Sequence, residues 1–410
     1  MPASRRHLRP LAVLAGFCAV ALSGPSPAQS PGDDPVARGK YLALLGGCAE
    51  CHSAEAGPFA GGRNFHSGLG TVGSANITPD PATGIGAWSQ DDFYRALHTG
   101  VSRKVGHLYP AFPYPYFTNI ARQDADDLFA YLRTAPPIRN EPKRDQLSFP
   151  LNIRAIMGVW NLLFFHEGSF RPDPDRTAEW NRGAYIVQAL AHCGDCHTPK
   201  NSLQADDRDR ALQGGAVEGW FAPSLTQEPR TGLGAWSRGD IALFLKTGQN
   251  RFTAAGGMMA GVVAGSTSKW DDADIGAVAT YLKSLPATPP ASVTPAPDAA
   301  SQARGQAVFE ASCARCHGAN ASPERGPPLP GSALTQAPNP ATVIRYVLAG
   351  SKTPVTAAHP KPEAMPAFGD KLSDGDIADV ANYIRNAWGN QASAVRPADV
   401  AKARKLAAAG

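Results

Sequence analysis

The pentapeptide Cys-x-x-Cys-His occurs three times in this chain of 410 residues and constrains its fold more than any other feature. Two thiols at this spacing can each form a thioether to a porphyrin, while the adjacent imidazole reaches the iron. A zinc site would need further ligands at each place, and a redox disulfide does not require the His. The sequence therefore predicts three covalent c-type haems. Their attachment residues are Cys48, Cys51 and His52, Cys193, Cys196 and His197, and Cys313, Cys316 and His317.

The first 30 residues have the pattern of a secretory leader. Three arginines precede an apolar run from Leu11 to Leu22 and a small-residue exit at 26–30. We expect residues 1–30 to be a signal peptide and the mature chain to be periplasmic. Its removal would leave 36 basic against 35 acidic residues, a balance that gives no case for nucleic-acid binding. No later apolar stretch approaches the roughly 20 residues that cross a bilayer.

The haem motifs divide the mature chain into three modules with the same order of parts. Residues 77–100 align without a gap to residues 225–248, with 12 identities in 24 positions. Each module has a helix before its motif, a Gly/Pro-rich loop, a short helix, and a last helix with apolar residues at helical spacing. This pattern predicts an all-α fold of three tandem class I cytochrome c domains.

The domain boundaries follow from the motifs and from composition. We expect domains over 31–150, 151–288 and 301–390, with a Pro/Ala linker at 289–300. The apolar connecting segment at 151–172 is expected to pack between the first two modules. The last segment, 391–410, is interpreted as a solvated tail in preference to a weak amphipathic helix.

Local signals mark the ends of the short helices. Ser89 with Asp92, and Ser237 with Asp240, have the spacing of a capping box. A glycine follows each helix at the point where a left-handed residue would end it. We therefore expect well-defined short helices in the first two modules.

A haem used for electron transfer usually has a second iron ligand, and methionine is the usual partner of histidine. Met365 lies on the loop before the last helix of the third module. Met258 and Met259 occupy the corresponding loop of the second module, and one of the two is the expected ligand. A thioether sulfur suits haem iron at either position.

The first module has Phe112 where the other modules carry methionine, and phenylalanine cannot bind iron. His107 lies on the same loop and is the favoured ligand. An open, five-coordinate iron is the main alternative, and His66 or His98 is another. Because methionine ligation raises the haem potential, a first haem with two histidines should be the most easily oxidised of the three.

Several long strings give the chain a family resemblance. They are Asn76–Asp80, Gly84–Ser89, Leu108–Tyr114, Glu179–Tyr185 and Cys193–Asn201. With these strings the chain resembles the triple-haem cytochrome c subunits of periplasmic, membrane-associated dehydrogenases that oxidise alcohols, gluconate, aldehydes and related sugars. Members of that family typically read Gly-x-Met in the second module, which matches Gly257 to Met259, and this resemblance favours Met259 over Met258 as the iron ligand. The alcohol-oxidising members have methionine at the position of Phe112, whereas phenylalanine resembles the subunits that accompany molybdenum hydroxylases.

The resemblance implies an electron-transfer subunit without substrate chemistry of its own. It implies a periplasmic catalytic partner, which is a quinoprotein, a flavoprotein or a molybdenum hydroxylase. Electrons would pass through three haems to ubiquinone or a terminal oxidase, and the subunit would attach peripherally to the membrane. Two other functions stay open on the residues alone: a haem enzyme that reduces peroxide or another small oxidant at an open first haem, and a free periplasmic electron shuttle.

Overall fold

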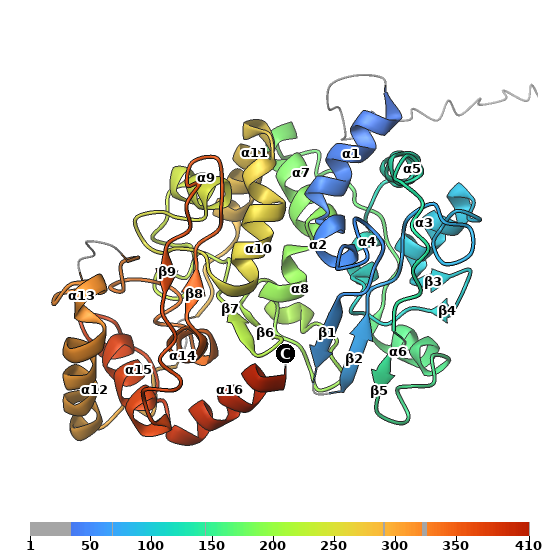
Figure 1. Cartoon of the computed structure of the whole chain (residues 1–410). Coiled ribbons are helices and arrows are strands. Elements are labelled where there is room, and N and C mark those ends of the chain that lie inside the picture. The colour runs from blue at the N-terminus through green and yellow to red at the C-terminus, as the bar shows by residue number, and fades with distance from the viewer. Residues whose placement is uncertain (1–33, 68, 144, 290–291, 322–325, 410) are drawn as a thin grey trace, which may run out of the picture.

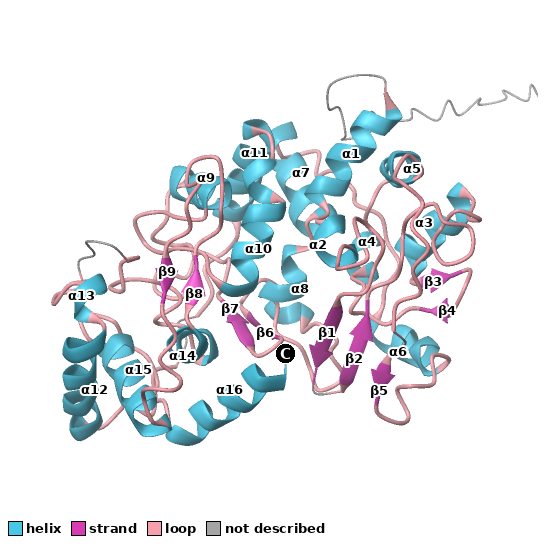
Figure 2. Cartoon of the chain, viewed as in Figure 1, coloured by secondary structure: helices cyan, strands magenta, loops and turns pink. Residues whose placement is uncertain are grey.

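The computed structural model describes residues 34–409 except 68, 144, 290–291 and 322–325. The signal peptide predicted at 1–30 lies outside the described residues. Helices dominate the fold, and short antiparallel strands join them (Figures 1 and 2). Within the described part of the chain, no helix has the length and apolar character needed to span a membrane.

The first module and the connecting segment contain six helices and five short strands among their described residues. The helices are α1 (Pro35–Leu45), α2 (Cys48–His52), α3 (Gln90–Thr99), α4 (Tyr114–Phe117), α5 (Arg122–Leu132) and α6 (Ile156–Phe164). The strands are β1 (Asn64–Ser67), β2 (Gly70–Gly73), β3 (Val101–Ser102), β4 (Gly106–His107) and β5 (Gln146–Leu147). β1, β2 and β5 form an antiparallel sheet in that order, and β3 pairs with β4.

The second module repeats the helical order of the first. Its elements are α7 (Ala178–Tyr185), a π-helical turn (Ile186–Leu190), α8 (Cys193–His197), a 3-10 turn (Arg208–Arg210), β6 (Gly215–Val217), β7 (Trp220–Ala222), α9 (Arg238–Thr247), α10 (Gly257–Gly265), a second 3-10 turn (Thr267–Lys269) and α11 (Asp272–Ser284). β6 and β7 form a hairpin.

The third module follows the same plan and ends in an additional helix. Its elements are α12 (Ala299–Ser312), α13 (Ala314–His317), α14 (Ala341–Ala349), β8 (Ser351–Lys352), β9 (Ala364–Met365), α15 (Asp374–Asn386) and α16 (Pro397–Ala409). β8 pairs with β9.

The predicted capping boxes of the short helices are confirmed. Ser89 and Ser237 each accept a hydrogen bond from the backbone N–H three residues later, and the aspartate at that position bonds back. Gly100 and Gly248 end α3 and α9 with φ of 66° and 80°, a left-handed conformation that glycine adopts without a steric penalty.

A glycine sets the crossing of the first and last helices in every module. A Cβ built on Gly39, Gly183 or Gly305 would lie 1.9–2.0 Å from a backbone carbonyl oxygen of the last helix. Only a residue without a side chain permits this approach of α1 to α5, of α7 to α11 and of α12 to α15. The three modules therefore share one helix-pair geometry, which positions the chain directly before each Cys-x-x-Cys-His motif.

The first two modules share a continuous apolar core, whereas the third has its own. Residues of α1, α5, α7 and α11 belong to one cluster that includes Leu45, Leu128, Tyr185 and Val278. A separate cluster around Phe309 fills the third module. The third module docks through α14 on the β6–β7 hairpin, where the rings of Tyr346 and Trp220 lie 5.6 Å apart.

The prediction of a solvated tail is wrong. Residues Pro397–Ala409 form α16, which packs against α14 and α15 (Figure 1). Val400 is fully buried in the core of the third module, and Arg404 pairs with Asp374 at 2.9 Å. The alanines and lysines of this segment form only a weak amphipathic pattern. The contacts of α16 with α14 and α15 show which face of the helix is buried.

Helix α6 of the connecting segment packs between the first two modules on one face, as expected, and leaves its other face exposed. Met157 and Trp160 of α6 are buried in a small cluster, and the Trp160 indole N–H donates to the Leu203 carbonyl of the second module at 3.0 Å. The opposite face of α6 is apolar and exposed, with Leu162 84% and Leu163 60% accessible.

Candidate haem sites

Each Cys-x-x-Cys-His motif forms a short helix directly after the first helix of its module. α2 and α8 contain both cysteines and the histidine, and α13 begins one residue after Cys313. All six cysteines are free thiols that are buried or half-buried. The structure therefore places the six predicted attachment residues in three equivalent positions.

The cysteine thiols of the motifs lie in surroundings of low polarity. Desolvation raises the pKa of Cys48, Cys193 and Cys196 to about 12 and the pKa of Cys51 and Cys313 to about 11. Burial disfavours a charged thiolate at these positions. A thioether carries no charge and suffers no such penalty. Among the residues that the structure describes, no group of three or more His, Cys, Asp or Glu side chains is placed to hold a metal ion such as zinc.

The first two motif histidines are oriented as iron ligands. Nδ1 of His52 donates to the Ala75 carbonyl at 2.7 Å, and Nδ1 of His197 donates to the Pro223 carbonyl at 2.6 Å. With the proton fixed on Nδ1, the lone pair of Nε2 is available to a metal. Burial also lowers the pKa of both rings, which keeps them in the neutral form that binds iron.

The motif histidine of the third module, His317, is half-buried. Desolvation lowers its pKa. The Pro327 backbone carbonyl, which lies near the ring, opposes this effect in part. Nδ1 of His317 lies 2.9 Å from the position of a Cβ built on Gly326. Glycine at 326 thus leaves room for the His317 ring.

The fold brings the first two motifs next to each other. Gly46, just before the first motif, lies against Leu190, just before the second: a Cβ built on Gly46 would be 3.6 Å from the Leu190 carbonyl oxygen. The first-module motif also contacts α10 of the second module, and Ser266, which follows α10, donates to the Leu44 carbonyl at 2.6 Å. His192 lies at this junction, with its ring 5.3 Å from that of Phe117.

Two reciprocal hydrogen bonds join the first two modules. The Tyr41 hydroxyl donates to Asp274 at 2.8 Å, and the Tyr185 hydroxyl donates to Asp124 at 2.6 Å. Tyr41 and Tyr185 occupy the same position after the crossing glycine, and the two aspartates occupy the same turn of the last helix. Sequence reasoning missed this pairing, although the equivalent tyrosines in the repeat were a signal for it. The third module has the exposed Ala307 at that position and makes no such bond.

The candidate methionine ligands lie on elements that precede the last helix of their module in the chain. Met258 and Met259 are half-buried in the first turn of α10. Met365 lies on β9, which pairs with β8, and packs against the core of the third module. The second module thus has two methionines, and the third has one, on the segment where the sequence predicts an iron ligand.

His107 lies on β4 and faces α6. Its Nε2 is 3.2 Å from the position of a Cβ built on Gly158. Its Nδ1 is buried and has no hydrogen-bond partner within the described part of the chain. Phe112, at the position of the missing methionine, packs edge-on to Phe117 with ring centroids 5.3 Å apart.

The two alternative histidines of the first module have other partners. Nε2 of His98 lies 3.2 Å from a Glu167 oxygen, and its ring stacks on Tyr94 at 4.8 Å. His66 is exposed on β1, where its Nδ1 is 3.0 Å from the Thr71 hydroxyl. These contacts hold both rings on groups other than a metal.

Comparisons with known proteins identify the family. The chain matches the cytochrome c family over residues 36–136 and 181–286, and the family described as cytochrome c oxidase, cbb3-type, subunit III over residues 300–384. It is 38% identical to the alcohol dehydrogenase (quinone), cytochrome c subunit of Gluconacetobacter polyoxogenes, covering 94% of this chain and 88% of that protein. The chain belongs to the cytochrome c subunits of dehydrogenases. The subunit is thus an electron-transfer protein, and the catalytic reaction takes place on another subunit.

Further relatives of this cytochrome c subunit are named for different dehydrogenases. The gluconate 2-dehydrogenase cytochrome c subunit of Pantoea cypripedii is 39% identical over 91% of this chain and 90% of that protein. A Pseudomonas putida protein that is named as part of nicotinate dehydrogenase is 40% identical over 85% of this chain, which corresponds to 30% of that longer protein. The same cytochrome architecture therefore occurs in proteins named for chemically different substrates.

The residues of the cytochrome c subunit fit haem c at the three motifs. The cysteines would hold the porphyrin through thioethers, and His52, His197 and His317 would bind the iron. When bound, the iron supplies a one-electron redox centre. The protein's part is to keep the three imidazoles neutral, to orient those of His52 and His197 through Nδ1, and to exclude water through the apolar cores on which the motif helices pack.

Proposed function

We propose that this cytochrome c subunit carries three haems, one on each of three tandem class I cytochrome c domains. It passes electrons from a periplasmic dehydrogenase catalytic subunit to ubiquinone or a terminal oxidase and attaches peripherally to the cytoplasmic membrane. The observation that carries the proposal is the threefold repetition of one arrangement. In each module the first and last helices cross at a glycine. The Cys-x-x-Cys-His motif follows directly, and its thiols are buried or half-buried.

The second iron ligands in this proposal are Met259 in the second domain and Met365 in the third. His107 is the proposed ligand in the first domain. Its position on the ligand-bearing loop carries this choice. Nδ1 is buried and unpartnered among the described residues in both His107 and His98, but Nε2 of His98 lies 3.2 Å from a Glu167 oxygen and His66 is exposed. A haem with two histidines would have a lower potential than the two haems with methionine.

The proposed route passes directly between the first and second haems. Support comes from the contact of Gly46 with Leu190 directly before the two motifs and from the shared apolar core of these two modules. The third haem would connect to the second through the β6–β7 hairpin and α14. There the Arg345 guanidinium stacks 4.2 Å above the Trp220 ring, and the Thr342 hydroxyl accepts from the Phe221 N–H at 2.8 Å.

The catalytic partner in this proposal is a quinoprotein, a flavoprotein or a molybdenum hydroxylase. Phe112 favours the last of these on the family resemblance, and one relative is named as part of a nicotinate dehydrogenase. Co-purification of the mature chain with a large dehydrogenase subunit tests this part of the proposal. If the mature chain is isolated as a free protein while the dehydrogenase activity is found in other fractions of the extract, this part of the proposal is contradicted.

The haem count is tested by mass spectrometry of the exported protein under denaturing conditions. The expected mass exceeds that of the mature polypeptide by three haems, and a Cys316→Ser variant should lose the haem of the third domain selectively or retain it through one thioether. A mass with two haems or fewer in the wild-type protein would contradict the proposal. Carbon monoxide added to the reduced protein then reports whether the first iron has an open position, as a haem enzyme would require.

A further inference from the structure

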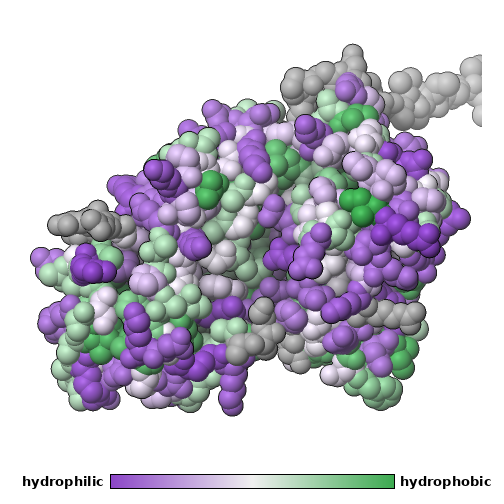
Figure 3. Space-filling model, viewed as in Figure 1, coloured by the Kyte–Doolittle hydropathy of each residue, from purple (hydrophilic) through white to green (hydrophobic). Residues whose placement is uncertain are grey.

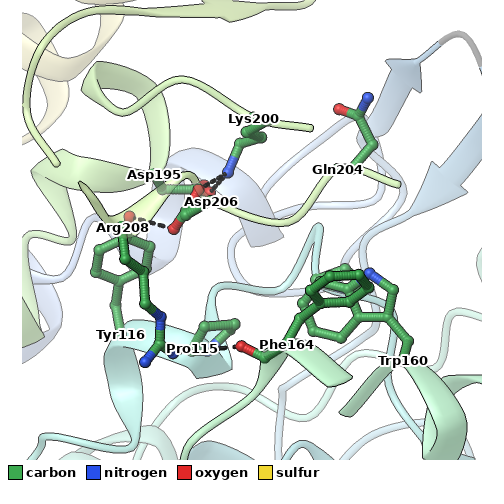
Figure 4. A pocket seen from close by; sticks show the side chains of 10 residues that line it. Pro115, Tyr116, Trp160, Phe164, Asp195, Lys200, Gln204, Asp206 and Arg208 are labelled. Atoms are coloured by element: carbon green, nitrogen blue, oxygen red, sulfur yellow. Dashed lines mark hydrogen bonds and ion pairs between the residues drawn. The ribbon is translucent and has the colours of Figure 1, made fainter. Parts of the chain in front are cut away.

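A hollow between α6 and the loop after α8 lies beside the second haem-attachment motif (Figure 4). Its outer part has a volume of about 390 Å³, within the ~300–1,000 Å³ range of small-molecule sites. A smaller inner recess shares Phe164, Lys200, Asp206 and Arg208 with the outer part. Asp195, which lies between the two cysteines of α8, lines this recess. The helix that would carry the second haem thus forms one wall of the hollow.

The inner wall of the hollow holds a hydrogen-bonded group of polar side chains (Figure 4). The Lys200 ammonium donates to Asp195 at 2.9 Å and to Asp206 at 2.7 Å, and the Tyr116 hydroxyl donates to Asp206 at 2.5 Å. An ammonium group has three N–H bonds, so Lys200 keeps one donor for a ligand. Arg208 donates to the Phe164 carbonyl at 3.3 Å and places a second cation at the rim.

The charges that line the hollow favour a neutral ligand over an anion. The lining contains at least as many carboxylates as cationic side chains. An anionic ligand would therefore gain little electrostatic free energy on binding. The charged lining residues are Asp195, Lys200, Asp206, Asp207, Arg208, Asp209 and Arg210. A neutral molecule with hydrogen-bond acceptors suits such a lining, because it can accept from Lys200 and Arg208 without disturbing the ion pairs of Lys200 with Asp195 and Asp206.

An exposed apolar surface leads into the hollow from α6. Val159, Leu162 and Leu163 are more than half exposed, and the turn before α6 adds the exposed Phe149 and Ile153. Figure 3 shows hydrophobic residues at the lower right of the molecule, where Figure 1 places α6 and β5. Leu163 belongs to both features, because it also lines the outer part of the hollow. Large exposed apolar patches mark interaction sites rather than inert surface.

We propose that this hollow binds the head group of a membrane quinone, and that the isoprenoid tail lies along the exposed face of α6. The assignment rests on the quinone acceptor under Proposed function and gives it a location. The quinone carbonyl oxygens accept hydrogen bonds from Lys200 and Arg208, and its ring packs against Phe164. Two electrons, supplied one at a time by the haem chain from the dehydrogenase reaction, and two protons from solvent convert the quinone to the quinol.

The test uses the mature, haem-loaded protein with its haems reduced chemically and the excess reductant removed. Decylubiquinone is added, and oxidation is followed by haem absorbance, with ferricyanide as a small soluble reference oxidant. For Arg208→Gln and for Leu163→Ser we expect the ratio of quinone rate to ferricyanide rate, at low quinone concentration, to fall about fivefold. This corresponds to the loss of about 1 kcal/mol of binding. Arg396→Gln and Leu243→Ser are matched exposed controls elsewhere and should keep the wild-type ratio.

Two results would overturn the assignment, and they differ in what else they affect. If decylubiquinone oxidises the wild-type protein and all four variants with the same ratio, the quinone site lies elsewhere while the quinone acceptor stands. If decylubiquinone fails to oxidise the wild-type protein but a terminal oxidase does so, both the site and the quinone acceptor are wrong. A photoreactive quinone that labels only peptides outside residues 110–116 and 149–210 would also overturn the location.

Discussion

Replacement of Tyr185 by phenylalanine removes one of the two reciprocal bonds between the first two modules with little change in side-chain volume. The Tyr185 hydroxyl is fully buried, donates to Asp124 at 2.6 Å and accepts from the Ala121 N–H at 3.1 Å. The other Asp124 oxygen has no hydrogen-bond partner among the described residues. The variant therefore leaves a buried carboxyl without any donor. A hydrogen bond to a charged group contributes about 1.5–3 kcal/mol, and we expect a loss of that size.

The equivalent change at Tyr41 is the internal control. Tyr41 is half-buried, and its acceptor Asp274 keeps two bonds of 2.8 Å from Arg182. Because Asp274 stays paired, Tyr41→Phe should cost only the net value of an ordinary hydrogen bond, about 0.5–1.5 kcal/mol. Both substitutions replace tyrosine with phenylalanine. The difference between their losses in free energy of unfolding therefore reports whether the aspartate keeps other hydrogen bonds.

Guanidinium unfolding of the haem-loaded protein, followed by circular dichroism, measures both losses. The hydrogen bond from Tyr185 favours the ionised carboxyl and so opposes the effect of burial, which raises the pKa of Asp124. Its contribution is complete above the pKa of Asp124 and is lost as the pH falls through it. The loss for Tyr185→Phe should therefore shrink in acid. Equal losses for Tyr185→Phe and Tyr41→Phe, or a loss for Tyr185→Phe that is the same at pH 4 and pH 7, would refute the reasoning.

Gly305→Ala should destabilise the third module by about 1–3 kcal/mol or more, because the new Cβ would lie 2.0 Å from the Asp379 carbonyl oxygen. Thermal unfolding checks this, and Gly375→Ala on α15, where the Ser373 hydroxyl oxygen is 3.5 Å from the position of the new Cβ, should be close to neutral. In a potentiometric titration, Met365→Ala should lower the potential of one haem, because methionine ligation raises it. His107→Ala should change only the component of lowest potential, and three equal potentials that ignore this substitution would exclude His107 as a ligand.

The local parts of the molecule were predictable from the sequence. The haem motifs, the capping boxes at Ser89 and Ser237 and the helical repeat all depend on residues a few positions apart, and such spacing is visible in a single chain. The Arg-Gly pairs before the motifs were also visible. Their role was not, because the carbonyl that excludes a Cβ at Gly183 comes from a helix more than 90 residues later.

The arrangement between modules required the tertiary structure. Tyr41 and Asp274 are 233 residues apart, and nothing in their local sequence shows that each module lends a tyrosine to the other. The last segment is a similar case. Its alanines were consistent with solvent or with a core, and Val400 is buried only because α14 and α15 present an apolar surface to α16.

By itself the sequence determined the chemistry, since covalent attachment of haem needs two thiols and an imidazole within five consecutive residues. It also determined that this unit recurs three times on helices of one pattern. Only the tertiary structure decided that the first two units share a core and a pair of crossed tyrosine bonds, that the third docks through α14, and that a polar hollow lies beside the second. These features depend on atoms that are distant in the chain and meet only when apolar surfaces are buried together.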